Sequence, residues 1–200
     1  MFSPAGLLLL FVGGSLGFIV FVVWSSYNRL VTLRNRYQSA YSQIDVQLQR
    51  RYDLIPNLVK TAKGYMAHER ETLQGVTEAR NLAIAASRQA ASNPSDPQTI
   101  QQAAAAEAGL TSMLSRLMAV AESYPNLKAD TTMLTLMEEL RTTENKIAFS
   151  RQAFNDSVTL YNTKREVFPS NLIASTFNFS VAELWRDLNP DARQAPQVSF

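Results

Sequence analysis

The sequence predicts an all-α protein in which a single N-terminal transmembrane helix continues into an antiparallel up-and-down four-helix bundle, followed by a less regular C-terminal tail. Three observations support this fold class. No side chain in residues 1–28 is charged, apolar residues then recur every three or four positions, and glycine and proline are sparse up to residue 168. We therefore expect a membrane anchor at residues 1–26, a long-helix bundle at 27–168 and the apolar tail at 169–200.

The composition argues against several kinds of chemistry. The 200 residues include 19 Lys and Arg against 17 Asp and Glu, giving a net charge of +2, with no Cys and with His68 as the only His. Disulfides, thiolate metal sites and thiol nucleophiles are therefore excluded, and a His-based metal site or catalytic triad is disfavoured. We expect no catalytic residues, no cofactor and no metal. We also expect no nucleic-acid binding, because no basic run carries stacking aromatic residues.

Residues 6–24 have the length and composition of a membrane span. At 1.5 Å per residue they match a hydrocarbon core about 30 Å thick. We predict a retained signal anchor, because no basic residue precedes the segment and no small-x-small cleavage site follows it. The residues suited to the membrane interface are Trp24, Tyr27, Arg29, Arg34 and Arg36. The positive-inside rule then places the N-terminus outside and the body in the cytoplasm.

Gly13 and Gly17 have the G-x-x-x-G spacing that allows two membrane helices to approach closely. Packing of one span against another copy is one interpretation of this spacing. The other is that glycine is simply frequent in spanning helices. Both interpretations stay open at the level of the sequence.

The first body helix is expected to continue directly from the membrane helix, because neither Gly nor Pro separates them. It carries one apolar stripe at steps of three and four: Leu30, Leu33, Tyr37, Tyr41, Ile44, Leu48, Tyr52, Ile55, Val59, Ala62 and Met66. Pro56 removes one backbone hydrogen bond within this helix, so we predict a kink near residues 52–55. Such a kink can serve packing or function.

Three further helices are predicted at residues 69–92, 97–123 and 131–167. Asp96 and Asp130 can cap the last two. The second and third helices are rich in Ala where they face each other, so their distal hairpin is expected to have a thin seam. Its tip is then either mobile or covered by a neighbouring molecule. The fourth helix follows a heptad spacing, and short loops favour an up-down-up-down bundle.

Five charged residues are predicted to form a polar layer in the bundle: Asp45, Arg51, Asp53, Glu144 and Arg151. Because a buried charge needs a partner, we expect Arg151 to contact Asp45 or Asp53, and Glu144 to contact Arg51 or another Arg. Alternatively, these side chains flank the seam and reach solvent. Acid-base catalysis would require a solvent-filled cleft, and no Gly-rich turn or cleft-forming loop accompanies the carboxylates.

The tail is too apolar for a disordered segment. The residues expected to make its contacts are Phe177, Phe179, Trp185, Val198 and Phe200. Folding back over one end of the bundle, docking on a neighbouring subunit and docking on the membrane are the three alternatives. The free C-terminus could also enter a carboxylate-capturing domain.

Several short motifs are spread along the whole chain. They are YNRLV at 27–31, IDVQL at 44–48, RRYDLIPNLV at 50–59, YPNLK at 124–128, FN at 154–155, YN at 161–162, FPSN at 168–171 and APQVSF at 195–200. Together these motifs resemble the LemA family of bacterial membrane proteins. The resemblance implies a single N-terminal membrane helix, a cytoplasmic body and an antiparallel four-helix bundle. Gene neighbourhood often links members of this family to membrane peptidases.

We therefore expect a non-enzymatic scaffold, anchored in the bacterial inner membrane, that forms homo-oligomers and organises or shapes the membrane. The expected partners are the lipid bilayer and further copies of the chain. The alternative is an adaptor that presents helices or its C-terminus to a membrane peptidase or a signalling protein.

Overall fold

The all-α prediction is confirmed. The computed structural model describes residues 4–186, and no strand occurs among them. The helices are α1 (Pro4–Tyr65), α2 (Arg70–Ser92), α3 (Pro97–Ala121), α4 (Pro125–Lys128), α5 (Thr131–Glu166) and α6 (Ser170–Thr176). The four long helices begin and end close to the predicted positions. The two short helices, α4 and α6, lie in segments that the sequence predicted to be irregular.

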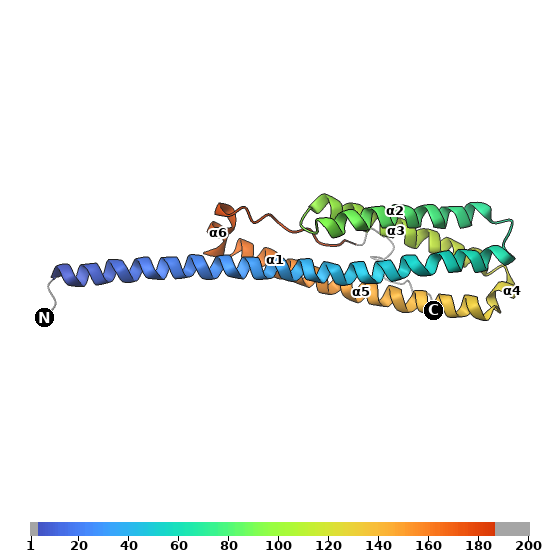
Figure 1. The fold of residues 1–200 in the computed structure, drawn as a ribbon, viewed down its shortest axis with the longest axis horizontal. Helices are drawn as coiled ribbons and strands as arrows, with labels where there is room; N and C mark the ends of the chain where they lie inside the picture. Colours follow the sequence, from blue (N-terminus) through green and yellow to red (C-terminus); the bar gives the residue numbers. More distant parts are fainter. Residues whose placement is uncertain (1–3, 187–200) are drawn as a thin grey trace, which may run out of the picture.

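The longest element, α1, runs without interruption from the N-terminal apolar segment into the body of the protein (Figure 1). Its 62 residues correspond to a length of about 93 Å. The predicted continuity between the apolar helix and the first body helix is therefore confirmed. The side chains of residues 11–21 are all exposed, so this part of α1 stands clear of the body as a stem.

The other long helices flank the C-terminal part of α1 (Figure 1). Helix α5 packs along α1, and α2 and α3 form a hairpin beside the half of the body farthest from the stem. The sequence predicted that the loop of this hairpin forms the distal tip of the bundle, and this prediction is wrong. It returns to the middle of α1, where the hydroxyl of Tyr37 and the amide of Gln38 each lie 3.0 Å from the Ser95 hydroxyl.

The core is built on the predicted apolar stripe of α1. Almost all of that stripe is buried: Leu30, Leu33, Tyr37, Tyr41, Ile44, Leu48, Tyr52, Ile55, Ala62 and Met66. Against α5 the contact is aromatic, with ring centroids 5.1 Å apart for Tyr37 and Tyr161 and 5.8 Å apart for Tyr41 and Phe154. Large rings bury much apolar area per residue, so this seam holds the two longest helices together.

The seam of the α2–α3 hairpin is made of small side chains, as predicted. Ala83 and Ala90 of α2 and Ala103 and Ala104 of α3 are buried. Small residues allow close approach of two helices but bury less area than the aromatic α1–α5 seam. The hairpin is therefore the part of the body with the thinner core.

Pro56 lies inside α1, which stays helical through it to Tyr65. Since proline has no N–H, the carbonyl of Tyr52, four residues earlier, has no helical donor. Another helix supplies one: Nε of Arg80 in α2 donates to the Tyr52 carbonyl oxygen at 2.7 Å. The proline thus creates a point of attachment between α1 and α2, whereas the kink predicted there stays a prediction.

Both predicted caps are present. A carboxylate oxygen of Asp96 accepts a hydrogen bond from the backbone N–H of Gln98, and one of Asp130 from that of Met133, each at 2.9 Å. Asp130 also accepts from the Tyr65 hydroxyl at 2.9 Å, which joins the end of α1 to the start of α5. These hydrogen bonds, that from Met133 first, hold the pKa of Asp130 below its ordinary value.

Replacing Arg80 should reveal its role at the Tyr52 carbonyl. We expect Arg80→Ala to lower the free energy of unfolding by about 1–3 kcal/mol, because a part-buried carbonyl loses its donor. In a Pro56→Ala background the same change should cost less, since an alanine at this position restores the helical N–H. Urea unfolding of the full chain in detergent measures both values, with the exposed Arg88→Ala as the control. Equal losses in the two backgrounds would contradict this assignment.

Candidate functional site

A buried ion-pair network surrounds Arg51 at the centre of the bundle. Nη1 of Arg51 lies 2.9 Å from Oε2 of Glu107 in α3, and Nε lies 2.9 Å from Oε1 of Glu144 in α5. Nη2 donates to the Thr111 hydroxyl at 2.8 Å. The Tyr52 hydroxyl donates to the other carboxylate oxygen of Glu107. One guanidinium on α1 therefore connects α3 with α5.

The predicted contact between Arg51 and Glu144 is present, but two of the predicted carboxylates lie elsewhere. Asp53 is exposed and accepts a hydrogen bond from Gln49 at 2.9 Å. Asp45 is half-buried and accepts one from the Ser87 hydroxyl of α2 at 3.1 Å. Asp53 lies on an outward face of α1 and Asp45 faces α2, so neither belongs to the layer around Arg51.

Arg151 also differs from the prediction. Among the contacts of residues 4–186 it does not pair with Asp45 or Asp53; instead its guanidinium lies 4.9 Å from the centre of the Trp185 ring. Such a cation-π contact stabilises the guanidinium above the ring. Arg151 therefore contacts the segment after α6, which the spacing of charges along two helices could not reveal.

Glu107, the fully buried acid of the network, was missing from the predicted layer. A signal for it existed in the sequence. Glu107 continues the alternating three- and four-residue spacing of the buried positions Ile100, Ala103, Leu110, Leu114 and Leu117. A lone acid at such a seam position needs a buried partner of opposite charge. The buried guanidinium of Arg51 is that partner.

The electrostatics of this network suit a structural role. Burial raises the pKa of Glu107, while Arg51 and the Tyr52 hydroxyl act in the opposite direction. Burial likewise raises the pKa of Tyr41 and of Tyr52. Both charged ends of the Arg51–Glu107 pair are shielded from solvent. Within residues 4–186, no group of three or more His, Asp and Glu side chains could hold a metal ion.

A groove of about 750 Å³ separates α3 and α5 beyond the network, towards the distal end. Leu114 and Met118 of α3 face Leu134, Met137 and Leu140 of α5 across it. Arg51 and Glu144 close its inner end. Leu134 and Met137 are exposed, and the charged side chains of Glu138 and Arg141 also line the groove. We call this feature the α3/α5 groove.

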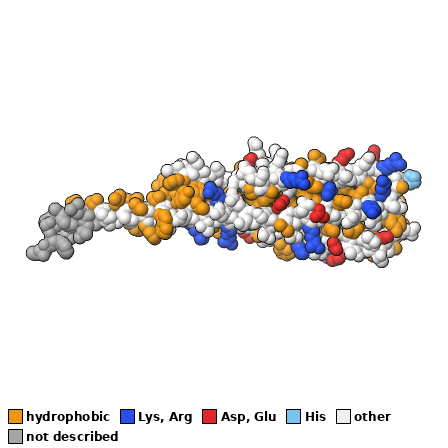
Figure 2. Space-filling model, viewed as in Figure 1, with side chains coloured by type: hydrophobic (Ala, Val, Ile, Leu, Met, Phe, Trp, Pro, Cys, Tyr) orange, Lys and Arg blue, Asp and Glu red, His pale blue; other side chains and the backbone are white. Residues whose placement is uncertain are grey.

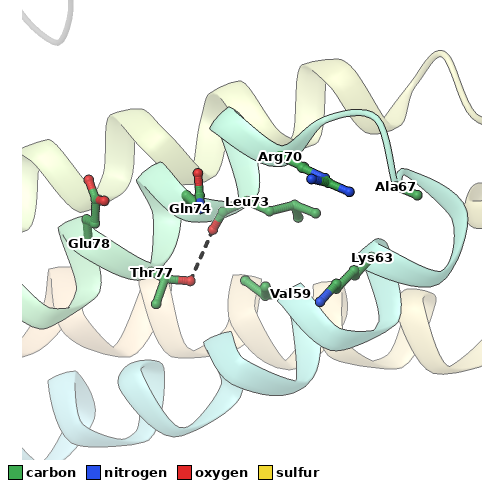
Figure 3. A pocket seen from close by; sticks show the side chains of 8 residues that line it. All are labelled: Val59, Lys63, Ala67, Arg70, Leu73, Gln74, Thr77 and Glu78. Atoms are coloured by element: carbon green, nitrogen blue, oxygen red, sulfur yellow. Dashed lines mark hydrogen bonds between the residues drawn. The ribbon is translucent and has the colours of Figure 1, made fainter.

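A smaller hollow of about 570 Å³ lies where α1 turns into α2 (Figure 3). Lys63 and Arg70 line it together with apolar Val59 and Leu73, and the Thr77 hydroxyl beside it donates within α2 to the Leu73 carbonyl at 3.0 Å. None of the predicted site residues lines this hollow, and the network around Arg51 does not reach it.

The segment after α6, residues 177–186, is an extended strap that returns along the bundle (Figure 1). Two asparagines of α5, seven residues apart, hold its backbone. The Asn162 amide accepts from the Ala182 N–H at 3.0 Å and donates to the Ala182 carbonyl at 2.9 Å. Asn155 makes the same pair of bonds with Trp185, at 2.8 and 2.9 Å. Each amide replaces the donor and acceptor that a neighbouring strand would supply.

Arginine and tyrosine side chains of α5 extend this clamp. Nε of Arg165 donates to the Phe179 carbonyl at 2.7 Å, and the Tyr161 hydroxyl donates to the Ser180 carbonyl at 2.8 Å. Burial raises the pKa of Tyr161 to about 12, which keeps this hydroxyl protonated as a donor. The asparagines of this clamp belong to the FN and YN motifs of the sequence, but the clamp itself was not predicted. The spacing of residues along a helix does not indicate that a side chain binds the backbone of another segment.

The side chains of the strap confirm part of the tail prediction. Phe179 and Trp185 are buried, with Arg34 5.1 Å from the centre of the Phe179 ring. Phe177 is 52% exposed, but its ring lies 5.0 Å from that of Tyr27. The described part of the tail therefore folds back on its own bundle. Val198 and Phe200 lie outside the described residues.

The predicted membrane-side residues lie along the stem and its base. By length and composition, α1 is apolar enough near the N-terminus to cross a membrane. A Cβ added at Gly13 or Gly17 would meet nothing within 4 Å, so this face of the single chain is open. Trp24 and Arg29 are exposed, as is Arg36. Tyr27 and Arg34, predicted for the interface, contact the aromatic rings of the strap.

The sequence is similar to a known family and to several known proteins. The model of the LemA family matches residues 40–200. Magnetosome proteins MamQ 1 and MamQ 2 of Paramagnetospirillum magneticum and MamQ of Magnetospirillum gryphiswaldense are each 27% identical over 176 residues. These alignments cover 80% of this chain but 65% of each relative, so the chain spans less than two thirds of their length. The apolar helix near the N-terminus fits a membrane anchor.

The Arg51–Glu107 pair should matter more for stability than a surface ion pair. We expect Glu107→Ala to lower the free energy of unfolding by about 3–5 kcal/mol, because it leaves a buried guanidinium without its main partner. The matched control is Glu138→Ala, whose partner Arg141 is exposed on α5 at 2.7 Å, and its effect should be small. Urea unfolding measures both, and equal effects would contradict the structural role of the network.

Removing the asparagine clamp should release the strap. We expect Asn155→Ala, in a Trp24→Phe background, to shift the emission of Trp185 to longer wavelength and to increase its quenching by acrylamide. The loss of two backbone hydrogen bonds should also cost about 1–3 kcal/mol. Gln152→Ala, an exposed position one turn away, serves as the control. Unchanged emission and quenching would show that the clamp does not hold Trp185.

Proposed function

The chain belongs to the LemA family, and from that premise and the geometry above we propose that it is a non-enzymatic scaffold, anchored in the bacterial inner membrane, that assembles with further copies of itself. The observation that carries this proposal is the unbroken helix α1. The same helix forms the apolar stem and the central element of the bundle. A bundle attached in this way stands at a fixed height and angle relative to its anchor.

The interior of the body supports a structural role. Its charged side chains are used to connect helices, since Arg51 joins α1 to both α3 and α5. The clamp on α5 likewise binds the backbone of the chain's own strap. A body whose helices are joined by buried contacts of this kind suits a spacer or a scaffold.

The orientation follows from the charges at the base of the stem. Arg29, Arg34 and Arg36 follow the uncharged segment, and no acid occurs before Asp45. On the positive-inside rule, the body lies in the cytoplasm and the short N-terminus outside. Trp24, exposed at the end of the span, lies at the level of the lipid-water boundary.

Assembly is proposed to involve the open Gly13–Gly17 face of the span. Glycines four residues apart let two helices approach closely in lipid, and within residues 4–186 nothing covers this face. The similarity to the magnetosome proteins MamQ accompanies the further proposal that such assembly organises or shapes the membrane.

Cross-linking in nanodiscs tests the scaffold. We expect the purified full chain to give products at multiples of 22.3 kDa, and expect Gly13→Leu with Gly17→Leu to reduce them, because leucine keeps the helices apart. Ser15→Leu, on the opposite side of the helix, is the matched control and should leave the products unchanged. Monomers alone from the unaltered chain would count against the scaffold.

A second candidate function, an adaptor for a membrane peptidase or a signalling protein, is favoured by the α3/α5 groove. In the described chain this groove lies between α3 and α5, and its lining combines exposed apolar side chains such as Leu134 and Met137 with charged ones. An adaptor would present this surface to a protein of a different kind rather than to another copy.

A photoreactive residue at Leu134 distinguishes the two functions. The adaptor predicts a cross-linked product in intact cells that contains one chain and a heterologous membrane protein, absent when the same residue replaces the exposed Leu82 of α2. Products formed only between copies of the chain would exclude the adaptor and favour the scaffold.

A further inference from the structure

Helix α6 lies at the level where the stem meets the body, and it runs across α1 rather than along it (Figure 1). It packs against both α1 and α5. Its buried side, Ser170 and Ala174, faces these helices. On α1, Ser26 is only 7% exposed and Val22 and Val23 are half-buried, whereas positions 11–21 are exposed. The body therefore reaches the last turn of the predicted span.

The outer side of this region is apolar. Five large apolar side chains between the end of α5 and the strap are exposed by 43–78%: Val167, Phe168, Leu172, Phe177 and Val181. Figure 2 shows hydrophobic side chains gathered at the base of the stem. A soluble surface rarely carries so many large apolar residues in one short segment. Phe177 also meets Tyr27, which the sequence predicts to lie at the membrane interface, in an edge-to-face ring contact.

The charges around this apolar segment are mainly positive. Arg29, Arg34 and Arg36 lie on α1 at its level or just beyond, and Lys164 and Arg165 lie in the last turn of α5. Glu166 is the acid among these neighbouring positions. Apolar side chains flanked by cations at the depth of the headgroups match the surface of a bilayer that contains anionic lipids.

We propose that α6 and its flanking residues form a second membrane contact, a foot, that lies in the headgroup region of an anionic bilayer and inserts Phe168, Leu172 and Phe177 among the lipids. The crosswise direction of α6 is the one that an interfacial helix takes beside a spanning helix. Without the foot, α1 would be the single attachment of the body to the bilayer, and the body could tilt about it. A second contact beside the span prevents this tilt. This inference rests on the proposed membrane anchor.

The absence of Cys from the chain allows a clean test with single labels. Leu16, Leu172 and Leu82 are exposed to similar extents, 64%, 58% and 67%, and lie in the span, in the foot and on α2. Each is replaced by Cys in the full chain and labelled with an environment-sensitive fluorophore. The variants are placed in nanodiscs of phosphatidylethanolamine and phosphatidylglycerol, with or without lipids that carry a quencher near the headgroup or deep in the acyl chain.

We expect the shallow quencher to reduce the emission from Leu172→Cys strongly, the deep quencher to act on Leu16→Cys, and neither to act on Leu82→Cys. If Leu16→Cys is quenched while Leu172→Cys behaves like Leu82→Cys, the anchor stands and the foot is wrong. An emission at Leu172→Cys that is blue-shifted but insensitive to lipid quenchers means that another copy covers it, which also overturns the foot. Absence of quenching at Leu16→Cys overturns the anchor itself.

Discussion

The architecture depends on one constraint: α1 is at once the apolar stem and the central helix of the body. Its Tyr and Leu stripe forms the core with α5, and Arg51 on the same helix binds α3 and α5. The Tyr52 carbonyl, which has no helical donor because of Pro56, accepts a hydrogen bond from Arg80 of α2. Because one rigid element takes part in all these contacts, the orientation of the bundle cannot change without moving the stem.

The two connections that α5 makes to other long helices differ in kind. Helices α1 and α5 meet through large aromatic rings, whereas α3 and α5 are connected by a buried guanidinium with a carboxylate on each side. Charged pairs require specific geometry but contribute less net stability than apolar packing of the same volume. The network thus fixes how α3 lies relative to α5, and the space that it leaves beyond Glu144 is the α3/α5 groove.

Periodicity was sufficient to predict the helices, the α1 stripe and the two aspartate caps, because these follow from contacts that are local or repeat along one face. It also predicted the meeting of Arg51 and Glu144. It failed for Asp45, Asp53 and Arg151, because spacing along a helix does not determine which helix each face meets. The asparagine clamp could not be predicted for another reason. Its partners are backbone N–H and C=O groups, and every residue of an extended segment except proline offers both.

The aromatic seam between α1 and α5 also dictates an order of events during synthesis. Tyr37 is covered by Tyr161 and Phe154, which leave the ribosome long after α1 and the α2–α3 hairpin are complete. The hairpin can pack early on the far half of α1, but the half nearest the stem waits for α5 and then for the strap. Until then, tyrosine and leucine side chains near the stem remain uncovered, so this is the stage at which a nascent chain is most exposed to aggregation or to chaperones.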